Sequence, residues 1–374
     1  MDFSFTEAQD AVTQVARKLF TERLTPQVLK AIDARDERYS SELWTELATS
    51  GLLGTCIAED HGGSAHGFLE LCSLLVEAGA AVAPVPLWPT LALGALPIAQ
   101  LGSDSLRARL LPDIVSGKII VTAALSETGS GEPHEISTRA LRDAGGWILS
   151  GAKTCVPAGM LADRMLVTAR AETGEVGLFL VDASANGVAQ ERQLTTNRES
   201  LARVTLTDVR VDDAEVLVAP SAKGAEALEM LLQHATVALC AIELGVVERA
   251  LRMTASYTTS RQQFDRPIAT FQAVTQRAGD AYVDVEVVRL TMWRAAWLLS
   301  EGRDAREAIA IAKYFACDAG HRVVYAAQHL HGGMGFDLDY PLHRYYLWSK
   351  QIELTLGSAA MHLTELGASL AARL

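Results

Sequence analysis

The sequence predicts an α+β multidomain protein with a helical N-terminal domain, a middle β domain and a C-terminal bundle of long helices. Apolar residues recur at helical spacing over 6–111. Over 121–218 they form short runs rich in β-branched residues, which are typical of strands. Helical spacing returns over 224–374. These changes of period predict three domains, at 1–119, 120–222 and 223–374.

The N-terminal domain is expected to be a bundle of helices. Thr6 predicts a helix start, because threonine is a favourable N-cap and the acidic Glu7 suits a first turn. Gly62 and Gly63 predict a break between helices. A further helix is expected to end within 77–86, where Gly and Pro follow one another.

The middle domain is expected to be a small antiparallel β-barrel or sandwich. Turn signals containing glycine separate its strand candidates. The candidates have β-branched or aromatic composition and lie at 119–122, 147–149, 164–168, 177–181 and 202–206.

The C-terminal domain is expected to be a bundle of long helices joined by short turns. Three stretches are each long enough to cross a domain, at 225–260, 272–301 and 306–331. Pro267 and the pair Gly332-Gly333 interrupt them.

The composition is that of an ordinary globular protein. Of the 374 residues, 49% are hydrophobic and 21% charged, which allows a large core and is not typical of disorder. The net charge of −12 disfavours nucleic acid as a partner, because an acidic surface repels phosphate backbones. Every apolar run is interrupted by a charge, Gly or Pro before it could span a bilayer, so we expect no membrane span.

The five cysteines are scattered and show no C-x-x-C spacing. This pattern favours reduced thiols over a disulfide framework or a zinc site. The first residues lack the basic and apolar regions of a secretory signal. We therefore expect a cytoplasmic protein without a metal site. The cysteines are Cys56, Cys72, Cys155, Cys240 and Cys317.

A first candidate site lies in the stretch from Arg261 to Gln272, between two predicted long helices. The guanidinium of Arg261 offers a planar fork of donors that suits a pyrophosphate. Taken alone, Arg261 could instead serve the last carbonyls of its helix, and Phe264 could be a core residue. The spacing of Arg261, Phe264, Pro267 and Gln272 as a set favours a cofactor site.

A second candidate site is the glycine-rich stretch from His329 to Phe336. Glycines let a backbone approach a ligand closely. The same turn can also end the preceding helix, and the two roles are compatible. We expect His331 to pack this turn rather than to bind a metal, because no second ligand stands at suitable spacing.

Together the two stretches resemble the C-terminal half of the acyl-CoA dehydrogenases. The segment 52–63 resembles that family's "GllG…PeeyGG" segment, and the resemblance covers essentially the whole chain. It implies an FAD-dependent oxidoreductase in which the first stretch reaches the FAD of a neighbouring subunit and the second approaches the adenine–phosphate half. The implied cofactor-binding residues are Arg261, Phe264, Gln272, Gly332, Gly333, Gly335 and His329, the last standing where the family has Gln.

Two motifs of the middle domain depart from the family pattern. In the stretch 125–132, which resembles "x-T-E-P-G-A-G-S", the Pro is Thr128 and the final Ser is Glu132. In the motif that resembles "K-x-W-I-T", Cys155 replaces the aromatic residue and Pro157 replaces the Thr that donates to the flavin. We expect these residues to form structural loops.

The general base of the family is missing at both positions where relatives carry it. The glutamate of the "Y-E-G-T" turn corresponds to Leu356, and the alternative glutamate on an earlier helix corresponds to Ala235. Neither side chain can accept a proton. Glu353, one helical turn before Leu356, is a weak candidate, since a solvated helix carboxylate is the simpler interpretation.

The residues that would contact the FAD of a neighbouring subunit are kept, and the residues that the chain would need for its own catalysis are lost. This predicts the non-catalytic subunit of a heteromer, similar to the subunits lacking a base in actinobacterial α2β2 acyl-CoA dehydrogenases of steroid side-chain degradation. A partner subunit with the glutamate would oxidise the acyl-CoA to a trans-2-enoyl-CoA, passing electrons to an electron-transfer flavoprotein. One alternative is a self-sufficient homotetramer with an atypical base, and another is a flavin-free scaffold.

Overall fold

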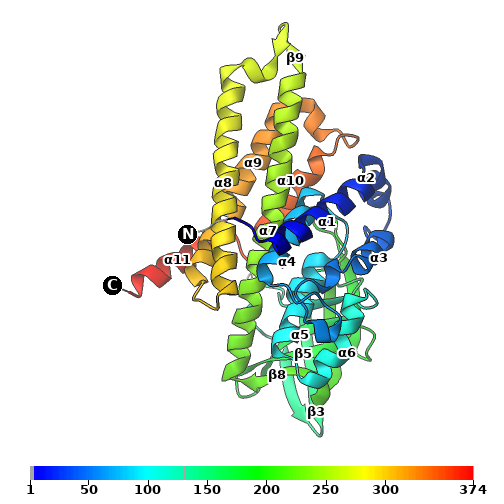
Figure 1. Ribbon diagram of the computed structural model, residues 1–374. Coiled ribbons are helices and arrows are strands. Elements are labelled where there is room, and N and C mark those ends of the chain that lie inside the picture. Colours follow the sequence, from blue (N-terminus) through cyan, green and yellow to red (C-terminus); the bar gives the residue numbers. More distant parts are fainter. Residues whose placement is uncertain (1–3, 130–131, 374) are drawn as a thin grey trace. The chain divides into compact units, whose positions relative to one another are not determined.

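Helices and a mixed β-sheet make up the computed structural model, which describes residues 4–129 and 132–373 (Figure 1). The order of helical, β and helical segments confirms the predicted fold class. The boundaries of the three predicted domains stay a prediction. The described chain divides into two units, the first comprising Met1–Ala34, Phe68–Ala83 and Thr236–Leu374 and the second Arg35–Gly67 and Pro84–Ala235.

The first unit is built of helices. They are α1 (Glu7–Arg23), α2 (Pro26–Asp33), α4 (Phe68–Ala80), α7 (Ala222–Ser260, from Thr236), α8 (Gln272–Ser300), α9 (Arg306–His331), α10 (Leu342–Leu354) and α11 (Ala359–Ala371). Three of them confirm the predicted long helices almost to the residue. Thr6 caps α1 as predicted: its hydroxyl accepts the Gln9 backbone N–H, and the Gln9 side chain accepts the Thr6 N–H.

Two glycines allow α4 and α7 to touch within the first unit. A Cβ on Gly79 would lie 2.1 Å from the Ile242 carbonyl oxygen, and a Cβ on Gly245 would lie 1.9 Å from the Val76 carbonyl oxygen. Any larger residue at either position would push the helices apart. This close contact fixes α7 against α4.

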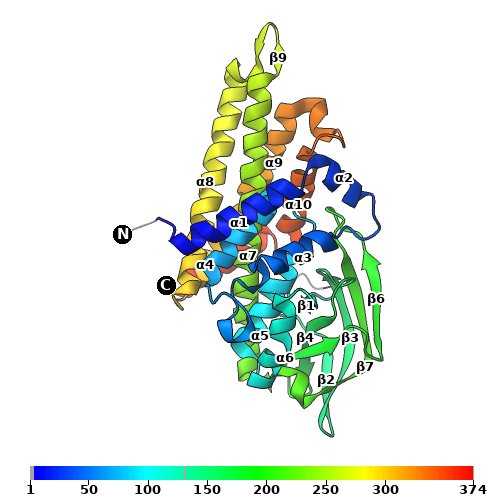
Figure 2. The same cartoon turned by 45° about the vertical axis from the view of Figure 1, so that its right-hand side comes forward.

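A two-stranded hairpin joins α7 to α8, which Figures 1 and 2 show side by side up to this point. Its strands are β9 (Gln262–Gln263) and β10 (Arg266–Pro267), and the short helix η5 (Ile268–Thr270) follows. The two turn residues, Phe264 and Asp265, have φ of 54° and 58°. Positive φ at both central positions defines a type I′ turn, which matches the twist of a hairpin.

The second unit holds a sheet of eight strands, several of which Figure 2 shows edge to edge. The strands are β1 (Val121–Ala124), β2 (Arg139–Asp143), β3 (Gly146–Val156), β4 (Arg164–Ala171), β5 (Val176–Asp182), β6 (Val188–Gln193), β7 (Leu201–Asp212) and β8 (Val216–Ser221). Its helices are α3 (Ser41–Thr49), α5 (Leu96–Leu101), α6 (Asp104–Val115), the π-helix η3 (Trp88–Ala95) and the short η1 (Leu52–Gly54), η2 (Glu59–His61) and η4 (Asp213–Glu215).

The sheet contains all five predicted strands and three more, β2, β6 and β8. Along the main path the order is β6-β7-β3-β2-β4-β5-β8, and β1 pairs with β4. Most pairs are antiparallel as predicted, but β1 and β2 both run parallel to β4. The sheet is therefore mixed.

Helix α7 is the one helix among the described residues that is long and apolar enough to cross a membrane. Within its most apolar window, 89% is buried inside the protein. The apolar side chains of α7 therefore serve the protein core.

Candidate functional site

The predicted cofactor residues Arg261, Phe264 and Gln272 all lie exposed on or beside the α7–α8 hairpin. The ring of Phe264 is 88% exposed. Below it, Phe271 meets Phe264 edge to face at 6.1 Å and carries the Arg266 guanidinium 4.0 Å above its ring. These contacts stiffen the hairpin while the outer face of Phe264 and the Arg261 side chain point away from the core.

The glycine turn lies close to the same end of α7. His331, the last residue of α9, is buried and stacks on Tyr257 with ring centroids 4.4 Å apart. Its Nδ1–H donates to the Ala327 carbonyl at 2.8 Å, and its Nε2 accepts from the Tyr340 hydroxyl at 3.1 Å. Burial lowers the pKa of His331, which favours this neutral form. His331 therefore packs the turn, and because Tyr257 is one helical turn before Arg261, the two candidate stretches come together.

The three glycines of this turn have different structural roles. A Cβ on Gly335 would lie 2.8 Å from the Gln328 side-chain nitrogen, so a larger residue there would require the Gln328 side chain to shift. Gly332 has a φ of 58°, which favours glycine at the end of α9. A Cβ on Gly333 would meet nothing within 4 Å, so this exposed backbone is open to approach from outside the chain. His329 is also exposed.

Leu356 lies at the far end of α10 from the glycine turn. The helix has 13 residues and so separates the two by about 20 Å. Leu356 has a φ of 55°, and its carbonyl accepts the Nε2–H of the buried His362 at 2.9 Å. The turn is thus held firmly, but the side chain at the family's base position is apolar.

Ala235, the alternative base position, is fully buried in the second unit. Its carbonyl accepts the indole N–H of Trp88 at 2.9 Å. Trp88 begins the π-helix η3, whose residues are mostly buried. The alanine side chain is enclosed in the core and has no group that can accept a proton.

Glu353 is engaged with its neighbours rather than free to act as a base. Its carboxylate accepts from the Lys350 ammonium at 2.6 Å, and the same ammonium contacts His321 Nδ1 at 2.9 Å. Both partners of the ion pair are 25% exposed. This arrangement fits the expectation of a helix-surface carboxylate.

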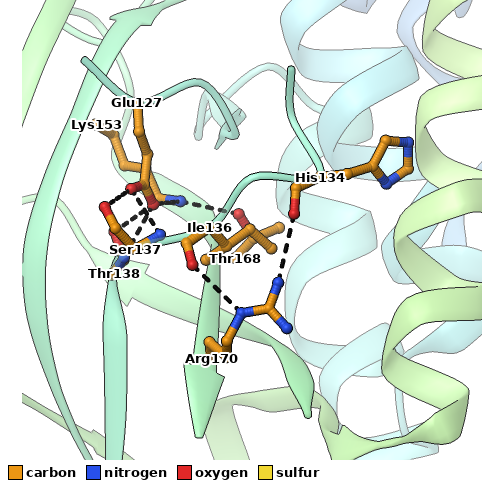
Figure 3. A network of polar contacts seen from close by, with 8 residues as sticks. All are labelled: Glu127, His134, Ile136, Ser137, Thr138, Lys153, Thr168 and Arg170. Atoms are coloured by element: carbon orange, nitrogen blue, oxygen red, sulfur yellow. Dashed lines mark hydrogen bonds and ion pairs between the residues drawn. The ribbon is translucent and has the colours of Figure 1, made fainter. Parts of the chain in front are cut away.

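In the second unit, a buried ion pair holds the loop that precedes β2 (Figure 3). The Glu127 carboxylate accepts from Lys153 at 2.7 Å and from the backbone and hydroxyl groups of Ser137 and Thr138, while Lys153 also donates to Thr168. Burial alone would raise the pKa of Glu127, but Lys153 and the two hydroxyl residues lower it to about 2. Burial lowers the pKa of Lys153 to about 8. Both groups are therefore charged at neutral pH.

Arg170 fixes the same loop from β4. Its guanidinium donates to the carbonyls of Ile136 at 3.3 Å and His134 at 3.4 Å (Figure 3). Ser130 and Gly131, which belong to the predicted motif 125–132, lie outside the described residues.

The altered motif at the end of β3 has no free donor where the family presents one. Cys155 has a φ of 49°, and its backbone N–H donates to the Gln193 side chain at 2.6 Å. Pro157 has no N–H, and its carbonyl accepts from Thr122 at 2.7 Å. These contacts agree with the expectation that this segment is structural.

Comparison with known proteins decides the family. Three family models match consecutive parts of the chain: acyl-CoA dehydrogenase, N-terminal domain, at 6–118; middle domain, at 122–209; and C-terminal domain, at 222–371. The chain belongs to the acyl-CoA dehydrogenase family. Acyl-CoA dehydrogenase FadE27 of Mycobacterium tuberculosis is 38% identical over 99% of both chains.

Two solved structures that each name two different proteins contain chains similar to this one. A chain of the ChsE4–ChsE5 complex from Mycobacterium tuberculosis has a TM-score of 0.94 at 38% identity, covering 99% of both chains. A chain of a Tcur3481–Tcur3483 steroid acyl-CoA dehydrogenase variant has a TM-score of 0.91 at 43% identity, covering 98% of both chains.

FAD is the cofactor of the acyl-CoA dehydrogenase family, and the exposed hairpin of this chain suits it. Arg261 and Gln272 offer uncommitted polar groups at the surface, and Phe264 offers an exposed ring beside them. The Gly333 backbone has open space around it. A donor fork, an amide and an open backbone are groups that bind phosphates and a ribityl chain.

The sequence reading missed a second buried polar cluster in this acyl-CoA dehydrogenase fold. Glu243 on α7 and Lys313 on α9 have no exposed surface. The sequence does contain a signal for this cluster, because Glu243 and Lys313 are each a lone charged residue inside an otherwise apolar helical run.

Proposed function

We propose that this chain is the non-catalytic subunit of a heteromeric acyl-CoA dehydrogenase and completes the FAD site of a catalytic partner subunit. The proposal rests on a contrast within this chain between exposed candidate cofactor residues and apolar residues at the expected base positions. Arg261, Phe264 and Gln272 are exposed, and within the described residues the side chains of Arg261 and Gln272 make no hydrogen bond or ion pair. Leu356 and Ala235 leave the same subunit without a base.

The exposed surface of the C-terminal helices supports an oligomer. Large apolar side chains are exposed there far more often than in the second unit, where only Leu141 and Leu194 are exposed among the described residues. Exposed apolar side chains of this kind are expected where a partner subunit covers them. The exposed set includes Phe264, Tyr282, Val283, Leu290, Trp297, Tyr325, Phe336, Leu338, Leu354, Leu363 and Leu370.

The similarity to subunits of the ChsE4–ChsE5 complex and of a steroid acyl-CoA dehydrogenase supports a CoA ester of a steroid side chain as the substrate class. The expected reaction is oxidation of the acyl Cα–Cβ bond to a trans-2-enoyl-CoA in the cytoplasm. Bound FAD supplies the hydride acceptor. The partner supplies the base, and an electron-transfer flavoprotein receives the electrons.

In the proposed heteromer, the residues of this chain bind and orient FAD. Arg261 would hold the pyrophosphate of FAD, Gln272 would hydrogen-bond the adjacent chain of the cofactor, and Phe264 would exclude water beside it. None of them moves a proton.

Expression with and without a partner tests the proposal. The chain alone is expected to be colourless and inactive with acyl-CoA substrates. Co-expression with an acyl-CoA dehydrogenase-like chain encoded by an adjacent gene should give a yellow complex that reduces an electron acceptor with a steroid-chain CoA ester. A yellow, active protein from this chain alone would favour the homotetramer, and a chain that stays colourless with every adjacent paralogue would favour the scaffold.

Glu353 distinguishes the heteromer from a self-sufficient enzyme. In the active complex, Glu353→Gln should leave kcat within about twofold of wild type, because the carboxylate serves an ion pair with Lys350. Steady-state kinetics at saturating substrate measure this. A fall of kcat by several hundredfold or more, as expected when a general base is lost, would contradict the assignment.

A further inference from the structure

Glu243 stands in the middle of α7 among buried apolar residues. Its side chain has no exposure to solvent. One carboxyl oxygen, Oε1, accepts from the Ser349 hydroxyl of α10 at 2.6 Å. The other, Oε2, is buried without a hydrogen-bond partner among the described residues. A carboxylate in this setting would carry a largely uncompensated charge.

The neighbouring helix makes room for this carboxyl group. Gly320 lies inside α9, where a glycine costs about 1 kcal/mol relative to alanine. A Cβ on Gly320 would lie 2.4 Å from Glu243 Oε1. The glycine is therefore explained by the carboxyl group, which is part of the packing of the bundle.

Lys313, one of the largest fully buried side chains, connects the cluster to the end of α10. Its ammonium donates to the Ile352 carbonyl at 2.6 Å, and Cys317, one turn later on α9, donates its thiol to the Glu353 carbonyl. These carbonyls belong to the last helical turn, where a cation is favourable, and the Ile352 carbonyl also accepts the Thr355 backbone N–H at 3.2 Å. Lys313 thus caps the helix end that leads into the Leu356 turn.

Several charged or titratable groups face Glu243. Its own helix places Cys240 nearby, and α4 packs through Gly79 with its acidic Glu77 already paired to Arg17. The groups from the other two helices are Lys313 and Cys317 on α9 and Ser349, Lys350 and Glu353 on α10. Burial raises the pKa of Glu243 to about 8, although Ser349 and Lys313 oppose the shift.

We propose that Glu243, Lys313 and Ser349 form a pH-sensitive clasp on the C-terminal turn of α10. With Glu243 as a neutral acid, Lys313 keeps its ammonium on the Ile352 carbonyl. When Glu243 releases its proton to solvent, the new carboxylate attracts Lys313 away from that carbonyl and uncaps α10. The clasp belongs to this chain alone and does not depend on the proposed function.

The sign of the pH effect follows from the raised pKa. Glu243 contributes stability that is fully present below its ordinary pKa of 4.5 and is lost as pH rises through about 8. Between pH 7 and 8.5 the equilibrium constant for closing the clasp should fall roughly tenfold. Lys153 also titrates in this range, so the effect of Glu243 must be isolated by comparison with a variant.

Glu243→Gln supplies that comparison, because glutamine keeps the size and cannot ionise. Hydrogen–deuterium exchange of the full chain, corrected for intrinsic rates, should show protection of 349–358 falling roughly tenfold from pH 7 to 8.5 in the wild type. The variant should keep its protection at both pH values. Exposed Glu226→Gln on α7 should behave as wild type.

Infrared spectroscopy gives an independent readout. At pH 7 the wild type and Glu226→Gln should show a band of an un-ionised carboxyl group that Glu243→Gln lacks. Lys313→Met, tested in case Glu243→Gln folds poorly, should show low protection of 349–358 at both pH values. Protection that is independent of pH in the wild type, an equal loss in Glu243→Gln, or the absence of the carboxyl band would overturn the clasp.

Discussion

At the scale of single residues, the Glu127–Lys153 ion pair shows how buried charges depend on one another. Its side chains are 4% and 0% exposed. Moving both charges out of water costs several kcal/mol each, which only their attraction and the surrounding hydrogen bonds can offset. Either residue is therefore harmful without the other.

Lys153→Met should lower the free energy of unfolding by about 3 kcal/mol, because it leaves the Glu127 carboxylate buried without a cation. Adding Glu127→Gln should recover part of this loss. Urea unfolding of the single and double variants measures both effects. Lys118→Met, which breaks an exposed ion pair with Asp113, is the control, and an equally small cost for Lys153→Met would contradict the account.

The Glu127–Lys153 pair also predicts that the protein loses stability at low pH. Glu127 has a lowered pKa, so its contribution is present above its ordinary value of 4.5 and is lost as pH falls toward about 2. Part of the acid sensitivity of the wild type should therefore be missing from the Lys153→Met variant.

Some single residues could be predicted from the sequence and others could not. Arg261 and Leu356 were singled out by the spacing of the motif residues around them, and the roles assigned to them stay predictions. The contacts of Leu356 with His362 and of Ala235 with Trp88 could not be predicted. Each joins segments whose approach depends on the tertiary fold.

At the scale of elements, regular apolar periodicity decided what could be predicted. Helices α7, α8 and α9 repeat an apolar face over many turns, and the sequence located them closely. Strands β2 and β6 were missed because their sequences are short, charged and largely exposed, and pairing with β3 and β7 stabilises them. The π-helix η3 was missed because its apolar run has no helical signature of its own.

The hairpin between α7 and α8 is an element held in a costly conformation. Phe264 and Asp265 both occupy the left-handed region that favours glycine, at a cost of order 1 kcal/mol each. An exposed aromatic ring at such a turn suits a segment that presents a side chain to another molecule.

Asp265→Gly should stabilise the hairpin, because glycine adopts a φ near 58° without steric cost. Exchange of backbone hydrogens in 261–268 should slow by a few-fold. Asp265→Ala is the matched variant: it removes the same carboxylate but keeps a Cβ, so exchange should be no slower than in the wild type. Equal stabilisation by both variants would show that charge, and not backbone strain, controls the turn.

At the scale of the whole molecule, the acyl-CoA dehydrogenase fold is kept while the chemistry at its base positions is absent. The α7–α8 hairpin presents Arg261 and Phe264 at the surface, and large apolar side chains are exposed on the C-terminal helices. Under the proposed function, a chain that keeps the family fold and lacks the base works with a catalytic partner subunit.

The most direct test measures FAD in the assembled complex when only this chain is changed. The complex is purified with this chain as wild type, as Arg261→Ala or as Arg252→Ala, an exposed arginine elsewhere on α7. We expect the wild-type, Arg261→Ala and Arg252→Ala complexes all to assemble. Only the Arg261→Ala complex should bind FAD about tenfold more weakly, because it loses a charge-assisted contact. An Arg261→Ala complex that retains FAD with wild-type affinity and stoichiometry would contradict this expectation.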